Sequence, residues 1–389
     1  MKRPIRTLAA AAAATALLGS FAVTSAFADG ATDKWPTYGE THVLNAAGGS
    51  TGSDGIRITY GGGQLTAQRQ DNPNAPDYPN NEIYSPSGLP GTESADRVFS
   101  QVALAVGDAT NGGTAFVSPA NLLDTQFAYD YVDNGEGEIY TPLVTRVPWN
   151  VTTTSSGDSI VSTLTGDADG LTYTVKVTIT YTTPDDRMKI DYEVIIPDGN
   201  TKAVRLYHLI DTYLGGNDAG PGFFTDPVDC GSGAESGAVV GVDRADLGVV
   251  QAFQYISGAP WTSYMSGYYS DVVFGNNGAT GESWGDGEHF GPGFGNDLNN
   301  QIITDPENDN GIGISWNFGS AAGTYDSVAK LIFSSDIVDP CADPEAVSVT
   351  NPDPTEVPNP VIDPDVTDPG VDPLKDEPTP EVVAPSFTG

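Results

Sequence analysis

Aromatic and acidic side chains crowd the segment from Tyr255 to Asn300, and proteins use these residue types to recognise sugars. Sugar rings stack on aromatic faces, while carboxylates and amides form hydrogen bonds with the hydroxyls. The residues assigned to a candidate ligand-binding site are Trp261, Tyr264, Tyr268, Trp284, Glu282, Glu288 and His289. The alternative interpretation is a long ordered loop whose aromatic side chains cap one end of a folded domain.

The same segment contains a pair of carboxyl groups of the kind that hydrolyses glycosidic bonds. Glu282 and Glu288 are the candidates for the acid and for the nucleophile or base, and the distance between them would decide the stereochemistry. His208 and His289 are further candidates in such an enzyme. The sequence does not supply the distance, and no catalytic residue is assigned.

A second candidate lies where a predicted strand, Val204–Leu214, runs into a glycine-rich acidic loop. His208 and Asp211 are three residues apart, so a strand places them on opposite faces and they do not form a pair. We therefore interpret His208 as a core residue on the face of Leu206 and Ile210.

Oxygen-bearing side chains at the end of this strand are candidates for a calcium site. Asp211, Asn217 and Asp218 are the possible ligands, although their spacing matches neither an EF-hand nor a repeat-type calcium loop. No other cofactor is expected.

The charge of the chain argues against nucleic acid as a partner. There are 52 acidic and 16 basic residues, giving a formal net charge of −36. Such a surface repels phosphate backbones and favours solubility, cations and basic partners.

The two ends of the chain predict export. Residues 1–28 have a basic start, an apolar run at Leu8–Val23 and a small-residue site at Ala26–Ala28, which together indicate a signal peptide. The mature chain should begin near Asp29 and contain no membrane span. Residues 339–389 hold 12 Pro and 12 Asp or Glu, a composition typical of a disordered acidic stalk. The predicted location is secreted or extracellular, with association to a cell wall left open.

Two cysteines, Cys230 and Cys341, are present in the whole chain. In an exported protein such a pair predicts a disulfide, here one that ties the start of the stalk to the folded part.

Residues 29–338 read as an all-β domain. In Leu171–Thr182 apolar and polar residues alternate with a period of two for twelve residues, which indicates a half-buried strand. The turn at Pro184–Asp186 joins it to a second alternating run ending at Ile196. Further strands are predicted at Ile56–Tyr60, Leu65–Arg69, Ser100–Val106, Thr125–Val132, Glu138–Val144, Ile160–Thr165, Val204–Leu214, Val249–Ile256, Ile312–Asn317 and Ser327–Ser334.

Long antiparallel strands with one polar face each predict two sheets packed together. We expect a large antiparallel β-sandwich, supersandwich-like and of the galactose-mutarotase type. Two smaller sandwiches, divided near Pro148 or Pro197, are the alternative. No helix is predicted after the signal peptide.

Three features together give the chain a resemblance to a known group of proteins. The run Tyr207–Gly222, the strand from Asp309 to Trp316 and the acidic proline-rich tail resemble secreted cell-surface proteins of actinobacteria. That resemblance implies a β-sandwich head carried on a stalk, and it assigns no catalytic residue.

The sequence supports two candidate functions. The first is a non-enzymatic, adhesin-like binding module at the cell surface or secreted, with a glycan or a protein as its partner. The second is a carbohydrate-active enzyme with a mutarotase-like or lyase-like sandwich. Two carboxylates and a histidine converging on one sheet face would favour the enzyme.

Overall fold

Alternating side chains build the long strands of this protein. In β10 (Leu171–Thr180) the apolar residues are buried, Val175, Val177 and Ile179 completely, whereas the threonines between them are partly or fully exposed. Asp169 and Gly170, both with positive φ, form the two-residue turn that pairs β10 with β9 (Ser159–Ala168). The computed structural model describes residues 42–51, 53–69, 81–83, 100–108, 112–118, 144–229, 235–273 and 293–334.

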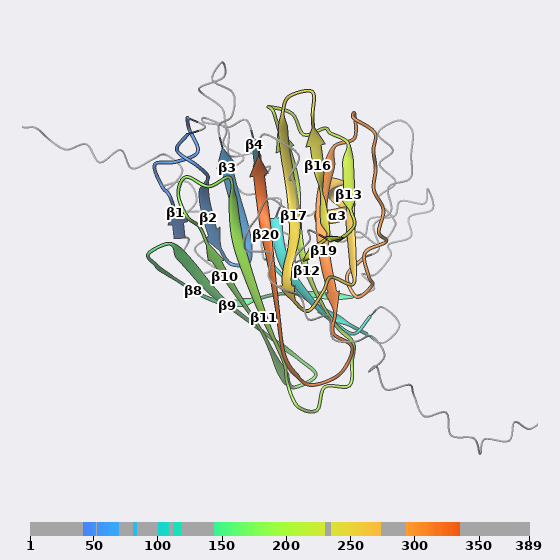
Figure 1. The fold of residues 1–389 in the computed structure, drawn as a ribbon. Helices are drawn as coiled ribbons and strands as arrows, with labels where there is room; N and C mark the ends of the chain where they lie inside the picture. The colour runs from blue at the N-terminus through green and yellow to red at the C-terminus, as the bar shows by residue number, and fades with distance from the viewer. Residues whose placement is uncertain are drawn as a thin grey trace, which may run out of the picture. The chain divides into compact units, whose positions relative to one another are not determined.

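Eight strands form one antiparallel sheet, seen at the front of Figure 1. Its last strand in the sequence, β20 (Gly323–Ser334), lies in the middle of the sheet between β17 (Val249–Gly258) and β11 (Arg187–Ile196). In spatial order the strands are β13 (Gly222–Thr225), β16 (Val239–Arg244), β17 (Val249–Gly258), β20 (Gly323–Ser334), β11 (Arg187–Ile196), β10, β9 and β8 (Asn150–Ser156).

Ten strands form the second sheet, which is organised around β12 (Val204–Leu214). Strand β12 pairs with β4 (Asn81–Ile83), β5 (Ser100–Val106) and β19 (Asn310–Asn317), and β19 also pairs with β18 (Ser263–Tyr268). The main path runs β1 (His42–Leu44), β2 (Arg57–Gly61), β3 (Gln64–Arg69), β4 (Asn81–Ile83), β12, β5 (Ser100–Val106), β6 (Thr114–Val117) and β7 (Thr145–Pro148). A separate hairpin joins β14 (Val228–Asp229) to β15 (Glu235–Ser236).

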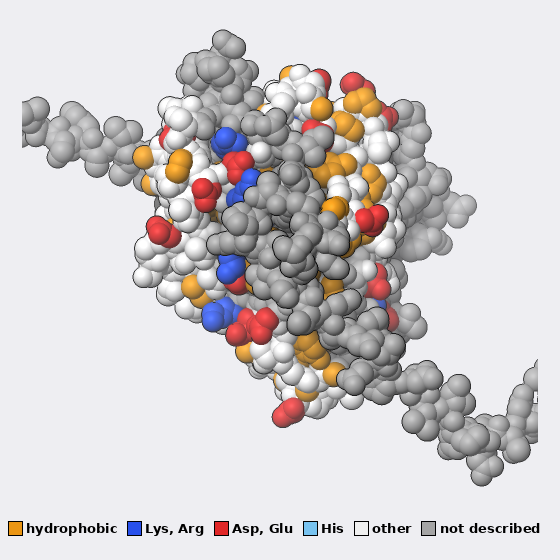
Figure 2. Space-filling view, viewed as in Figure 1, with side chains coloured by type: hydrophobic (Ala, Val, Ile, Leu, Met, Phe, Trp, Pro, Cys, Tyr) orange, Lys and Arg blue, Asp and Glu red, His pale blue; other side chains and the backbone are white. Residues whose placement is uncertain are grey.

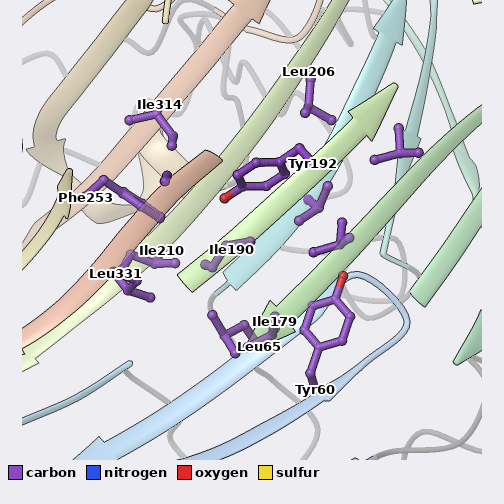
Figure 3. Close-up of a cluster of buried hydrophobic side chains, with 14 of the residues drawn as sticks. Tyr60, Leu65, Ile179, Ile190, Tyr192, Leu206, Ile210, Phe253, Ile314 and Leu331 are labelled. Atoms are coloured by element: carbon purple, nitrogen blue, oxygen red, sulfur yellow. The ribbon is translucent and has the colours of Figure 1, made fainter. Parts of the chain in front are cut away.

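The main hydrophobic core lies between the two large sheets. Leu206 of β12 and Ile314 of β19 belong to the same buried cluster as Tyr192 of β11 and Phe253 of β17, and Figure 3 shows these side chains facing one another. Burial of this apolar surface on one face of each sheet is what holds the two layers together.

The outer face of the ten-stranded sheet is also covered near β12. A second buried cluster contains Tyr207 and Leu209 of β12, together with Val272 of the short helix α3 (Tyr269–Val273). Helix α3 approaches closely because Gly311 on β19 has no side chain: a Cβ there would lie 3.0 Å from Cα of Tyr269. Strand β12 is therefore buried on both faces, and α3 lies beside its end (Figure 1).

The structure confirms the predicted all-β sandwich fold. The strands Ser100–Val106 and Val204–Leu214 have the predicted bounds, and the strand predicted at Ile312–Asn317 begins two residues earlier, at Asn310. Helix α3, five residues long, was not predicted. Of the two strands predicted at 125–132 and 138–144, all residues except Val144 lie outside the described residues.

Several predictions concern parts of the chain that the structure does not describe. The signal peptide, the stalk and both cysteines, Cys230 and Cys341, lie outside the described residues, and the domain limits and the disulfide stay predictions. In the described part of the chain, no helix combines the length and apolar character that crossing a membrane requires.

In the view of Figure 2, Lys and Arg side chains lie close to Asp or Glu side chains on part of the face, and further acidic side chains lie apart from them. Examples of the pairing are Lys189 with Asp191 at 3.0 Å and Arg187 with Asp186 at 2.8 Å. Pairs of this kind, which are at least partly exposed, contribute little to stability individually.

Candidate functional site

His208 of β12 points into the core between the two sheets, as predicted. Its side chain is completely buried, and Nδ1 lies 2.5 Å from the hydroxyl of Tyr192, while its ring centroid lies 5.0 Å from that of Phe253. Burial lowers the pKa of His208 to about 3, so the imidazole is neutral at physiological pH. Nε2 has no hydrogen-bond partner among the described residues. His208 is thus a core residue and is separated by the sheet from Asp211.

Asp211 lies on the opposite face of β12 and is also buried, with 1% of its surface exposed. Its Oδ1 has no hydrogen-bond partner in the described part of the protein. Burial raises the pKa of Asp211 well above its usual range, and the negative charges of Asp309 and Asp218 raise it further. An unpaired buried carboxyl of this kind costs stability and is typical of functional sites.

Two more acidic residues, Asp218 and Asp309, lie at the same end of β12, where backbone pairing holds them. Asp218 lies on the turn after β12, and its carbonyl oxygen accepts a hydrogen bond of 3.1 Å from the amide of Asn310. Ala219 pairs with Asp309 in an isolated antiparallel bridge, directly before β19. Burial, and then the charge of Asp218, raises the pKa of Asp309 to about 7. The Oδ1 atom of Asp309 has no hydrogen-bond partner among the described residues.

Two tyrosines at the junction of β18 and α3 complete the arrangement. The amide of Tyr269 donates a 3.0 Å hydrogen bond to the carbonyl of Asp309, and the rings of Tyr268 and Tyr269 lie 5.0 Å apart. Burial raises the pKa of Tyr268, and the charge of Asp309 raises it further. Both side chains are partly exposed. We call Asp211, Asp218, Asp309, Tyr268 and Tyr269 the acidic–tyrosine cluster.

Basic side chains do not neutralise this cluster. Within the described part of the chain, no Lys, Arg or His side chain pairs with Asp211, Asp218 or Asp309. Arg244 comes near, because its Nη1 donates to the carbonyl of Ala219 at 2.7 Å, but its guanidinium forms two hydrogen bonds with Asp246. The charged forms of these carboxyl groups therefore have no basic partner among the described residues, which agrees with the raised pKa values of Asp211 and Asp309.

The structure joins two sites that the sequence analysis treated separately. Tyr268 comes from the predicted aromatic site, and Asp211 and Asp218 come from the predicted calcium site. The sequence analysis assigned neither Asp309 nor Tyr269 to a site. A partial signal for Asp309 was present, because it lies three residues before the strand predicted at Ile312–Asn317.

Two of the other predicted aromatic residues, Tyr264 and Trp261, pack against aromatic neighbours of their own. Tyr264 stacks on Phe224 of β13, with ring centroids 3.9 Å apart and an angle of 5° between the planes. Trp261 packs edge to face against Tyr255 at 6.2 Å. Each ring thus already has an aromatic partner within the protein. The remaining members of the predicted site, Trp284, Glu282, Glu288 and His289, lie outside the described residues.

The third predicted calcium ligand, Asn217, is exposed, and its Oδ1 accepts a 2.9 Å hydrogen bond from the amide of Ala219. Among the described residues, no three His, Cys, Asp or Glu side chains come together as a group that could hold a metal ion. The calcium site stays a prediction.

Another buried acid lies on β4, the strand that pairs with the end of β12. Glu82 has 4% of its surface exposed, and burial raises its pKa to about 8. Its neighbour Asn81 points to the eight-stranded sheet, where its amide donates to the carbonyl of Val250 at 3.2 Å and its oxygen accepts from Gln251. This polar network links the two layers.

Comparison with known proteins gives little further information. No protein-family model matches the chain, and no curated protein matches it. One solved structure that resembles it is a bacterial glucoamylase complexed with acarbose, with 10% sequence identity and a TM-score of 0.37. The match covers 74% of this chain and 32% of that enzyme, so this chain spans about a third of the length of its structural neighbour.

Proposed function

We propose that this protein is an exported, non-enzymatic binding module that recognises a glycan through the acidic–tyrosine cluster. One observation carries the proposal: the partly exposed Tyr268 and Tyr269 pair through their backbone with Asn310 and Asp309, and Oδ1 of Asp309 has no hydrogen-bond partner within the described residues. Sugar hydroxyls donate hydrogen bonds to such oxygens, and the C–H faces of sugar rings pack on aromatic rings.

The position of His208 supports binding rather than catalysis. A histidine acting as acid or base must lie within hydrogen-bond reach of the reacting groups. His208 instead bonds to Tyr192 in the core, on the other face of the sheet from Asp211. His42, the other histidine in the described residues, lies 2.8 Å from the hydroxyl of Ser155 at the opposite edge of the sandwich.

The proposal also includes secretion of the protein and display of its folded domain at the cell surface. The basic start, the apolar run and the small-residue site in residues 1–28 favour secretion, and the acidic proline-rich residues 339–389 favour a stalk that holds the domain away from a cell surface.

Glycan-array binding of the mature full-length protein tests the proposed function. We expect retention of a defined set of glycans, and a loss of about 3- to 10-fold in affinity for Tyr268→Ala, because one aromatic contact is removed. The control is Tyr325→Ala, which removes a tyrosine of β20 that packs against Phe318. Wild-type binding by Tyr268→Ala, or no glycan retained by the native protein, would contradict the proposal.

A carbohydrate-active enzyme is the second candidate, and Asp309 is the observation that favours it. A carboxyl group with a pKa of about 7 holds a proton at neutral pH and can protonate a leaving group. Incubation of the retained glycans with the protein, followed by measurement of new reducing ends, tests this activity. Cleavage that disappears in Asp309→Asn would establish the enzyme.

A further inference from the structure

We propose that residues 335–341, which directly follow β20, fold back across the outer face of the eight-stranded sheet as a strap. The strap packs Ile337 and Val338 on an apolar patch of β16 and β17, and it ends at a disulfide between Cys341 and Cys230. This proposal is independent of glycan binding.

An apolar patch lies on the outer face of β16 and β17, away from the second sheet. Val240 on β16, and Val249 and Phe253 on β17, belong to the main core between the sheets. Because side chains alternate along a strand, the residues next to these three point to the outer face. The outer apolar patch consists of those neighbours and of one residue of β13 that packs on them: Val239, Val250, Ala252 and Phe223.

The outer apolar patch is buried, although it lies on the outside of a two-layer sandwich. Val239, Val250 and Ala252 have 2%, 1% and 0% of their surface exposed. On the same face of β11, by contrast, Lys189 and Ile195 are exposed. Among the described elements, the main contacts of β17 outside its own sheet are with β4, β12 and β19, all of which belong to the second sheet. The burial therefore points to a further segment of the chain on the outer face.

The end of β20 brings the next residues of the chain to the outer apolar patch. Ser334, the last residue of β20, pairs with Val250 in the ladder between β20 and β17. The seven residues that follow contain two adjacent aliphatic side chains, Ile337 and Val338, among Ser, Asp, Pro and Cys. Packing these two side chains on the patch removes apolar surface of both partners from water.

The length of the strap agrees with an end point at Cys230, which directly follows β14 (Val228–Asp229). Strand β13, which precedes β14, lies three strand spacings from β20, or about 14 Å. The end of β13, Thr225, pairs with Val239, four residues along the strands from the level of Ser334, or about 13 Å. The diagonal between these two ends is thus about 19 Å, and seven extended residues span up to about 24 Å.

The disulfide makes the strap sensitive to the redox compartment. The bridge forms when the thiols of Cys230 and Cys341 lose two protons and two electrons to a disulfide-bearing oxidant, which is reduced to a dithiol. Export delivers the chain to a compartment where such bridges persist. The strap is therefore expected to be fixed after export and released under reducing conditions.

Double-mutant cycles test the contact between the strap and the outer apolar patch. In the mature full-length protein, Val239→Ala is combined with Ile337→Ala and with Val338→Ala, and thermal unfolding is measured for each single and double variant. We expect each single change to lower the melting temperature by about 2–5 °C. In at least one cycle the double variant should lose about 1–2 °C less than the sum, because both changes remove the same contact. The matched control is Ile362→Ala in the predicted stalk, whose effect should add to that of Val239→Ala.

Peptide mapping of the unreduced protein tests where the strap ends. We expect one linked pair of peptides, containing Cys230 and Cys341 of the same molecule, and a rise in the fluorescence of an apolar dye on reduction, because the released strap exposes the patch. Additive shifts in both cycles would overturn the strap. Two free thiols, or a bridge between two molecules, would overturn its attachment at Cys230.

Discussion

Ionisable side chains are buried at several places in this protein. The effect of pH on stability has one sign for the buried carboxyl groups and the opposite sign for the buried histidine. Glu82, Asp211 and Asp309 have raised pKa values because burial disfavours their charged form. His208 has a lowered pKa for the same reason, because its charged form is the protonated one. Each group therefore favours its neutral form in the folded protein.

Replacement of Glu82 by Gln isolates one of these effects. The pKa of Glu82 is about 8 in the folded protein and close to 4.5 in the unfolded chain, so the free energy of unfolding falls as the pH rises through that window. Glu82→Gln should remove this slope and stabilise the protein at pH 9 by up to about 4 kcal/mol. Urea unfolding at pH 5 and pH 9 measures the difference, with Glu193→Gln on β11 as the control. A slope unchanged by Glu82→Gln would contradict the assignment.

Replacement of His208 by Phe tests the opposite sign. The folded pKa of about 3 lies below the unfolded value of about 6.5, so stability is lost as the pH falls from 6.5 towards 3. At pH 8 we expect His208→Phe to cost about 1–3 kcal/mol, because the hydroxyl of Tyr192 loses its partner. At pH 4 the cost should be smaller, as measured by urea unfolding. A cost that grows on acidification would refute this account.

At the scale of elements, helix α3 is the part that sets the position of the acidic–tyrosine cluster. It begins at Tyr269, and it can approach the sheet because β19 carries glycine at positions 311 and 313. A Cβ at Gly311 would meet the carbonyl of Ile210 at 2.9 Å and Cα of Tyr269 at 3.0 Å. Both contacts are with backbone, which cannot move out of the way as a flexible side chain can.

We therefore expect Gly311→Ala to move α3 away from the sheet. The variant should lose about 1–3 kcal/mol of stability and bind the glycan more weakly, because Tyr269 shifts relative to Asp309. Thermal unfolding and calorimetric titration measure the two effects. The control is Gly267→Ala on β18, where the nearest atom to a new Cβ is the flexible end of Met265 at 2.7 Å. Equal effects of the two substitutions would argue against this role of α3.

The secondary-structure elements differ in how well the sequence predicts them. Strand β10 was predictable because its alternation places Val175, Val177 and Ile179 on one face, and the burial pattern follows that alternation. Helix α3 was not predictable, because five residues are too few to show the repeat of apolar residues that indicates a helix. The predicted grouping of Asp211 with Asp218 is local, whereas Asp309 joins them through strand pairing across about ninety residues, which no local pattern encodes.

At the scale of the whole molecule, N-terminal sequencing and the intact mass of the mature protein test two predictions. We expect N-terminal sequencing of the exported protein to start near Asp29. The intact mass without reductant should be lower by two hydrogens than the mass after reduction, because Cys230 and Cys341 form a disulfide. A retained leader would contradict export, and two free thiols would contradict the disulfide.

The two strands nearest the end of the described chain hold the interior positions of both sheets. Strand β19 lies between β12 and β18, and β20 lies between β17 and β11. In a polypeptide interrupted before Asn310, β12, β18, β11 and β17 would each lack one of the strands they pair with, so neither layer is complete until almost the whole domain has been synthesised. Folding is thus expected to be late, slow and cooperative, and a shortened product should be degraded rather than persist as a half-domain.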